Sequence, residues 1–140
     1  MFDIFQIAKS DCSFLKECYI DYLNGGKKFD SYLGGLGGDM NTFNTFIIIA
    51  YKFCVHAEHM GLGYKYPAQR MMKLLQVFNP ELANRYDQDN DTPEAETFRA
   101  TLMVTALSYA FDMDLRPEFR HLNFPIDDTT YKELMFMLVE

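Results

Sequence analysis

Cysteine is scarce in this sequence, and the three that occur form no recognisable pattern. Cys12, Cys18 and Cys54 are odd in number, and no two of them make a CxxC pair. A secreted domain built on a disulfide framework usually has an even number of cysteines. We therefore expect all three to be reduced, buried thiols, as is typical of a cytoplasmic protein.

Long hydrophobic runs are also missing. The longest uninterrupted apolar run covers residues 46–51, whereas a membrane-spanning helix needs roughly 20 apolar residues. The N-terminal sequence MFDIFQIAKSD has no basic segment ahead of a long apolar stretch, so it lacks the pattern of a signal peptide. These absences favour a soluble, cytoplasmic protein with no membrane partner.

Basic residues are few and scattered. The chain has 13 lysines and arginines against 20 acidic residues, which gives a net charge of −7, and its one adjacent basic pair is Lys27-Lys28. Nucleic acids are bound through clustered basic side chains, so the composition argues against a direct nucleic-acid ligand. A basic protein is the partner that this charge favours.

Signatures of catalysis and of cofactor binding are absent as well. There is no GxSxG nucleophile motif, and the chain has three histidines to offer as a base. The glycine-rich segment 34–38 lacks the Lys-Ser or Lys-Thr pair that completes a phosphate-binding loop. The adjacent Asp127 and Asp128 would diverge on a helix, so capping of a helix is their expected role. We predict a protein that is not an enzyme and needs no cofactor.

Apolar residues are most concentrated at residues 43–60, FNTFIIIAYKFCVHAEHM. At the helical period of about 100° per residue, apolar side chains spread round most of this segment, while Lys52, His56 and His59 belong to a narrow polar strip. A helix that is apolar on nearly all sides is normally buried among other helices. This pattern predicts a buried central helix over residues 41–60.

Proline and glycine divide the rest of the chain into further helices. Pro67, Pro80 and Pro93 each suit the first position of a helix, where the fixed φ of proline costs nothing. In the helix that Pro67 starts, the spacing places Leu75 and Phe78 toward the core. No segment alternates with the period of a strand. The sequence predicts one all-α domain, residues 1–140, with about six or seven helices near residues 11–23, 41–60, 67–78, 80–86, 93–113, 116–119 and 129–139.

The central segment also contains a group of potential metal ligands, CVHAEH, from residue 54 to residue 59. Cys54 and Glu58 are one helical turn apart, but both point away from His56. His56 and His59 share a side with Lys52, whose positive charge opposes a bound cation. A helical metal-binding enzyme or sensor that uses His56 and His59 is therefore an alternative to the leading interpretation.

Negative charge is concentrated at residues 87–96, which hold five acidic residues and no Lys or Arg. The start of this segment resembles a calcium-binding loop, but Thr92 and Phe98 stand where such a loop needs Gly and Glu. A dense negative patch can steer a basic protein toward its binding surface. The predicted partner contact consists of Tyr86, Asp87, Asp89, Asp91, Glu94 and Glu96, with the segment 34–38 as a further candidate.

These features together predict a non-catalytic, acidic protein inhibitor. Its most concrete form is a bacterial immunity protein, an antitoxin that binds a basic toxin or nuclease and blocks its active site. This interpretation rests on an analogy with a class of small acidic helical proteins. An adaptor or chaperone-like module, whose Met and Phe residues line an exposed apolar groove, is a further alternative.

Overall fold

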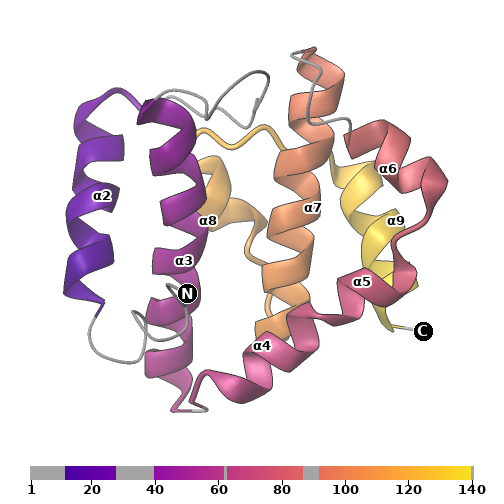
Figure 1. Cartoon of the computed structure of the whole chain (residues 1–140), viewed down its shortest axis with the longest axis horizontal. Helices are drawn as coiled ribbons and strands as arrows, with labels where there is room; N and C mark the ends of the chain where they lie inside the picture. Colours follow the sequence, from indigo (N-terminus) through magenta and orange to yellow (C-terminus); the bar gives the residue numbers. More distant parts are fainter. Residues whose placement is uncertain (1–11, 28–39, 62, 87–91, 140) are drawn as a thin grey trace.

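The computed structural model describes residues 12–27, 40–61, 63–86 and 92–139. Every regular element in these ranges is an α-helix, so the all-α prediction is confirmed. No helix in these ranges has the length and the apolar composition that crossing a membrane would need. The helices, labelled as in Figure 1, are α2 (Ser13–Asn24), α3 (Met40–Met60), α4 (Lys65–Met71), α5 (Lys73–Val77), α6 (Pro80–Tyr86), α7 (Pro93–Phe111), α8 (Arg116–Arg120) and α9 (Asp128–Val139).

Most helix starts follow the local signals in the sequence. The hydroxyl of Thr92 accepts a hydrogen bond from the backbone N–H of Ala95 at the start of α7. The carboxylate of Asp127 accepts one from the N–H of Thr130 at the start of α9. Such caps satisfy N–H groups that have no partner within the helix. α4 differs from the prediction, because it begins two residues ahead of Pro67.

α7 is the helix that its neighbours surround. Thirteen of its 19 residues are buried, and it packs against α3, α4, α6, α8 and α9. Figure 1 shows α7 between the α2–α3 pair and the helices α6 and α9. α3, the helix expected at the centre, is less enclosed over the part whose side chains the structure describes, residues 47–60: five of these 14 residues are buried, and the last three are exposed. The central place in the bundle therefore belongs to α7, with α3 packed along it.

Small polar side chains allow α7 to be buried on nearly all sides. The hydroxyls of Thr101 and Thr105 donate to carbonyl groups four residues earlier in the helix. The Thr101 hydroxyl also accepts from the N–H of Asp127, and the Ser108 hydroxyl accepts from the N–H of Leu115. These bonds satisfy groups that would be costly to bury alone. They also attach Leu115, just before α8, and Asp127, just before α9, to α7.

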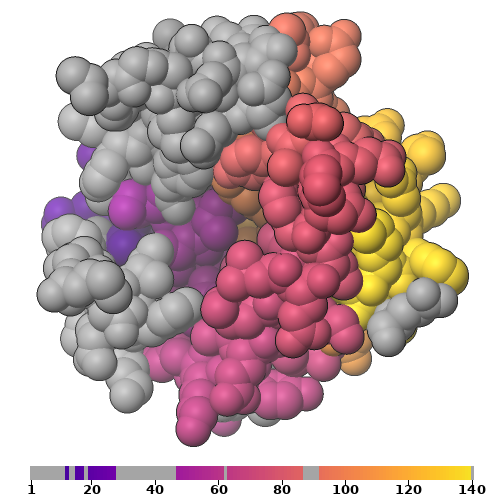
Figure 2. All heavy atoms as spheres, turned by 45° about the vertical axis from the view of Figure 1, so that its right-hand side comes forward, coloured from indigo at the N-terminus to yellow at the C-terminus, as the bar shows by residue number. Residues whose placement is uncertain are grey.

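α4 and α5 replace the single helix expected over residues 67–78, because the helix is interrupted at Met72. Leu75 is 67% exposed and Phe78 is 37% exposed, so the expectation that both face the core is wrong. Because α5 is a separate helix, the period that places Leu75 and Phe78 on the core side of one continuous helix does not hold beyond Met72. Figure 2 shows α4, α5 and α6 as a band across one face of the molecule, beside α9.

Candidate functional site

Only part of the predicted partner contact lies within the described residues. Asp87, Asp89 and Asp91 lie outside them. Glu94 and Glu96 lie in the first turn of α7, where the helix dipole favours negative charge. Glu94 is exposed and Glu96 is partly buried, so Glu94 is the described acidic residue of this set that is most accessible to a partner.

Tyr86 has a structural role at the end of α6. Its ring meets that of Phe78 edge to face, with 6.3 Å between the centroids, and its carbonyl accepts a 2.8 Å hydrogen bond from Arg99. Burial raises the pKa of Tyr86, and the positive charge of Arg99 partly opposes that rise. Arg99 is fully buried, so Tyr86 fastens α6 to a buried cation of α7. A contact between Tyr86 and a partner stays a prediction.

A groove of about 420 Å³ lies beside Glu94, where the starts of α7 and α9 come together with the end of α6. We call it the acidic groove. It adds Arg85 of α6, together with Asp127 and Thr130 at the start of α9, to the contact predicted from the sequence. Its lining residues are Arg85, Pro93, Glu94, Thr97, Phe98, Asp127 and Thr130.

The basic residue in the acidic groove is already paired. The guanidinium group of Arg85 donates to the carboxylate of Glu133 at 3.0 Å and to the hydroxyl of Thr130 at 3.2 Å. Its Cζ atom lies 4.5 Å from the centroid of the Phe98 ring, in a cation–π contact. Arg85 is paired with Glu133, and its charge also helps to lower the pKa of Asp127. The lining still has one more negative than positive charge, since Glu94 and Asp127 face Arg85 alone.

Two carboxylates give the acidic groove its charge. The Asp127 carboxylate accepts hydrogen bonds from both the hydroxyl and the N–H of Thr130, and these bonds hold the pKa of Asp127 below its ordinary value. Glu94 forms no ion pair with another residue in the described ranges. The groove is therefore suited to a cationic group rather than to an anion.

A second group of charged residues joins α3 to α8. The carboxylate of Glu118 lies 2.8 Å from Nε2 of His56 and 3.3 Å from Nζ of Lys52. The side chains of Lys52 and His56 are only 12% exposed, whereas His59 is exposed in the last turn of α3. His56 is thus engaged between helices, and neither His56 nor His59 belongs to a group of three potential metal ligands within the described ranges.

Glu118→Gln is expected to lower the free energy of unfolding by about 2 kcal/mol at pH 7, because it removes charged hydrogen bonds. Burial alone would raise the pKa of Glu118, but the hydrogen bond with His56 and the charge of Lys52 outweigh it, so the folded pKa lies below 4.5. The stabilisation is present above pH 4.5 and is lost as the pH falls through the lower folded pKa.

Urea denaturation at pH 7 and at pH 3 measures this effect. The difference between wild type and Glu118→Gln should shrink at the lower pH. Glu133→Gln is the control, because its exposed pair with Arg85 contributes less than about 1 kcal/mol. An equal loss in both variants, or a difference that does not change with pH, would contradict the assigned role of Glu118.

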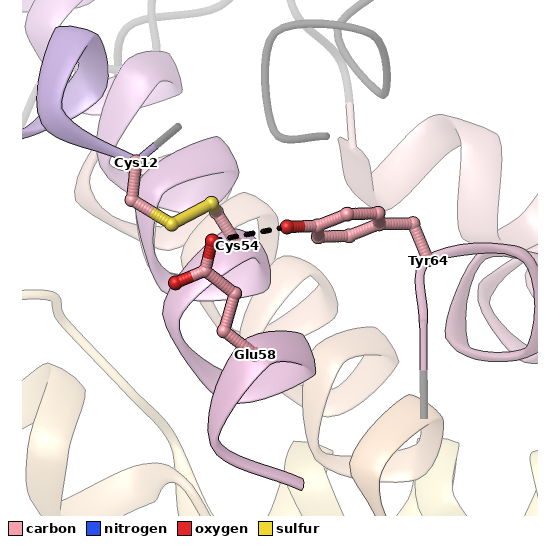
Figure 3. Close-up of a disulfide and its surroundings, with 4 residues drawn as sticks. All are labelled: Cys12, Cys54, Glu58 and Tyr64. Carbon is pink, nitrogen blue, oxygen red and sulfur yellow. Dashed lines mark hydrogen bonds between the residues drawn. A yellow bond between two sulfur atoms is a disulfide. The ribbon is translucent and has the colours of Figure 1, made fainter. Parts of the chain in front are cut away.

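Cys12 and Cys54 form a disulfide, so the expectation of reduced thiols is wrong for these two residues. They are 42 positions apart in the sequence, with 6.0 Å between their Cα atoms. Figure 3 shows the bond between the start of α2 and the side of α3, next to Glu58 and Tyr64. The bond covalently links two helices that also pack together. The expectation for the side chain of Cys18 lies outside the described residues.

Comparisons of this chain with protein-family models, with curated proteins and with solved structures find no match.

Proposed function

We propose that this protein is a non-catalytic inhibitor of a basic protein, most concretely an immunity protein that neutralises a basic toxin or nuclease. The observation that carries the proposal is the acidic groove, in which Glu94 and Asp127 share one concave surface with Phe98. The net charge of −7 and the five acidic residues of the segment 87–96 support the same partner chemistry. The acidic groove and this segment adjoin in the chain, so they form one expected contact.

A lysine or arginine side chain of the partner suits the chemistry of the acidic groove. Its aliphatic part can lie against the exposed Pro93, while its cationic end meets Glu94 and Asp127. The Phe98 ring is buried beneath Arg85 and forms the floor of the acidic groove. A nuclease needs basic side chains to hold phosphate groups, so an inhibitor that engages such a side chain withdraws it from the substrate.

Removal of the two groove carboxylates is expected to weaken binding to a basic probe. In the variant Glu94→Gln/Asp127→Asn, the asparagine retains an oxygen that can cap α9, so the fold is preserved. The probe is a fluorescein-labelled peptide of arginine residues, and fluorescence anisotropy at low salt measures its affinity. We expect affinity to fall about tenfold, which corresponds to about 1.4 kcal/mol of lost charge complementarity.

The control variant Glu17→Gln/Asp21→Asn removes the same charge from exposed positions of α2. Its affinity for the peptide should change less than about twofold, because those positions are outside the groove. Equal weakening in the two variants would mean that the peptide responds to net charge alone and would reject the groove as the contact.

Replacement of Asp87, Asp89 and Asp91 by asparagine tests the neighbouring acidic segment. Association with the same peptide should slow, and the dependence of the association rate on salt should become flatter. Stopped-flow fluorescence measures the rate. An association rate equal to that of the wild type at every salt concentration would contradict a steering role for the segment.

An adaptor that binds an apolar partner is the second candidate, because large apolar side chains are exposed on α5 and α9. These two helices pack together, and exposed apolar patches often mark protein contacts. This candidate uses a different surface from the acidic groove, so the two functions can be separated by locating the contact. The exposed residues are Leu75 on α5, Met72 just before it, and Phe136 and Val139 on α9, with exposures of 67%, 56%, 66% and 67%.

The cytoplasmic location expected from the sequence stays a prediction. The Cys12–Cys54 disulfide removes the argument from reduced thiols, because disulfides persist mainly in oxidising compartments. The proposed inhibition depends on the charge and shape of the acidic groove, so it does not depend on which compartment holds the protein.

A further inference from the structure

Three potential metal ligands meet at the disulfide, away from the acidic groove. The Sγ atoms of Cys12 and Cys54 and a carboxylate oxygen of Glu58 all lie within 4.8 Å of one another. Figure 3 shows Glu58 one turn along α3 from Cys54, with its carboxylate beside the sulfur atoms. No other group of three such ligands occurs in the ranges that the structure describes.

Tyr64 orients the carboxylate of Glu58. Its hydroxyl donates a 3.2 Å hydrogen bond to Oε1 of Glu58, and its ring stacks on Phe53. Hydrogen bonds of this kind commonly fix the ligands of a metal site. Glu58 forms no ion pair within the described ranges. Its negative charge is therefore oriented beside the two sulfur atoms.

The ligand types and their spacing suit zinc. Zinc accepts thiolate and carboxylate ligands together, whereas calcium and magnesium prefer ligand sets made of oxygen. A tetrahedral site with Zn–S bonds of about 2.3 Å places its sulfur atoms about 3.8 Å apart. The Cα atoms of Cys12 and Cys54 are 6.0 Å apart, so side-chain rotation can provide that separation without moving the helices. Glu58 is exposed, which leaves a fourth position open to water.

We propose that Cys12, Cys54 and Glu58 form a zinc site that becomes available when the disulfide is reduced. A dithiol reductant supplies two electrons and two protons, so the Sγ–Sγ bond breaks, two thiols form, and the reductant closes to its own disulfide. Zinc then binds both sulfur atoms as thiolates, and the two thiol protons are released. Glu58 and one water molecule complete the tetrahedron.

The two forms of the site hold α2 against α3 by different bonds. The disulfide links the helices under oxidising conditions, and zinc links them under reducing conditions. The link is lost only in the reduced protein without metal. This arrangement allows the α2–α3 pair to persist in either kind of compartment.

A zinc titration of the full chain tests the site. The protein is reduced with dithiothreitol, desalted under nitrogen, and titrated with zinc in competition with a chromogenic chelator. We expect one zinc per chain in the reduced protein and no stoichiometric zinc in the oxidised protein. Cobalt in place of zinc should give thiolate charge-transfer bands in the near ultraviolet and the visible bands of a tetrahedral ion.

Variants identify the ligands. Cys54→Ser should weaken zinc binding by at least about 100-fold and Glu58→Gln by at least about tenfold, because loss of a supporting residue alone costs 10–100-fold. Tyr64→Phe keeps the ring and should cost about tenfold. Cys18→Ser, which removes the remaining thiol, should bind zinc like the wild type. Circular dichroism confirms that each variant is folded.

Failure of the reduced wild type to bind zinc would overturn the proposal. It would also be overturned if Glu58→Gln and Cys54→Ser bound zinc as tightly as the wild type, or if Cys18→Ser lost the metal. Cys54→Ser could fail to fold, and Glu58→Gln then decides, because it leaves the disulfide intact during purification.

Discussion

Opening of the Cys12–Cys54 disulfide in metal-free buffer is expected to lower the free energy of unfolding by about 4 kcal/mol. The cysteines are 42 positions apart, and a bond that closes a loop of this length removes conformational entropy worth about 4 kcal/mol from the unfolded chain at 25 °C. Urea denaturation of the double variant Cys12→Ser/Cys54→Ser, compared with the oxidised wild type, measures the loss.

Cys18→Ser is the matched control and should change the free energy of unfolding by less than about 1 kcal/mol, because it leaves the cross-link in place. Added zinc should return part of the lost stability to the reduced wild type but not to the double variant, since only the former has both sulfur ligands. A loss below about 1 kcal/mol in the double variant would contradict a structural role for the bond.

Phe111→Ala is expected to destabilise the protein by about 3–5 kcal/mol. Phe111 ends α7 and is 1% exposed. Its ring centroid lies 5.5 Å from that of Phe53 and 5.5 Å from that of His56, both on α3. Truncation to alanine therefore leaves a cavity at the place where α7 packs against α3, and close-packed interiors relax only partly around such a cavity.

Phe136→Ala provides the control for this prediction, because it makes the same change at a position of α9 that is 66% exposed. Thermal denaturation should show a change within about 0.5 kcal/mol for the control. Equal destabilisation of the two variants would contradict the packing of α7 against α3.

The starts of α7 and α9 could be predicted because their signals are local. Thr92 and Pro93 mark the start of α7, and Asp127 marks the start of α9. The capping hydrogen bonds of Thr92 and Asp127 join residues only three positions apart in the sequence. The interruption at Met72 has no comparable signal, since no proline or glycine stands there. The helical period therefore predicts Leu75 in the core, but α5 does not continue the period of α4, and Leu75 is exposed.

The central position of α7 could not be predicted from hydrophobicity. Buried residues such as Thr101, Thr105 and Ser108 count as polar in the sequence, but their hydroxyls are satisfied by backbone groups in the folded chain. The more apolar segment that forms α3 consequently looked more central. Which of the two long helices is enclosed depends on the helices that pack against it, and the hydrophobic pattern of a single segment does not show these neighbours.

The sites depend on pairs that are distant in the sequence. Helical spacing correctly places Cys54 and Glu58 on one side of α3, but nothing in the spacing connects them to Cys12. Likewise, Glu94 was a predicted contact residue, whereas Asp127 was expected only to cap a helix. The groove that unites Glu94 and Asp127 arises from the packing of α7 against α9.

Amide chemical shifts of the ¹⁵N-labelled protein, followed during titration with the arginine peptide, test the proposed binding surface most directly. We expect the largest changes at residues 92–98 and 127–130, which line or adjoin the acidic groove. Changes centred on α5 and the end of α9, or of equal size across all exposed acidic residues, would contradict it.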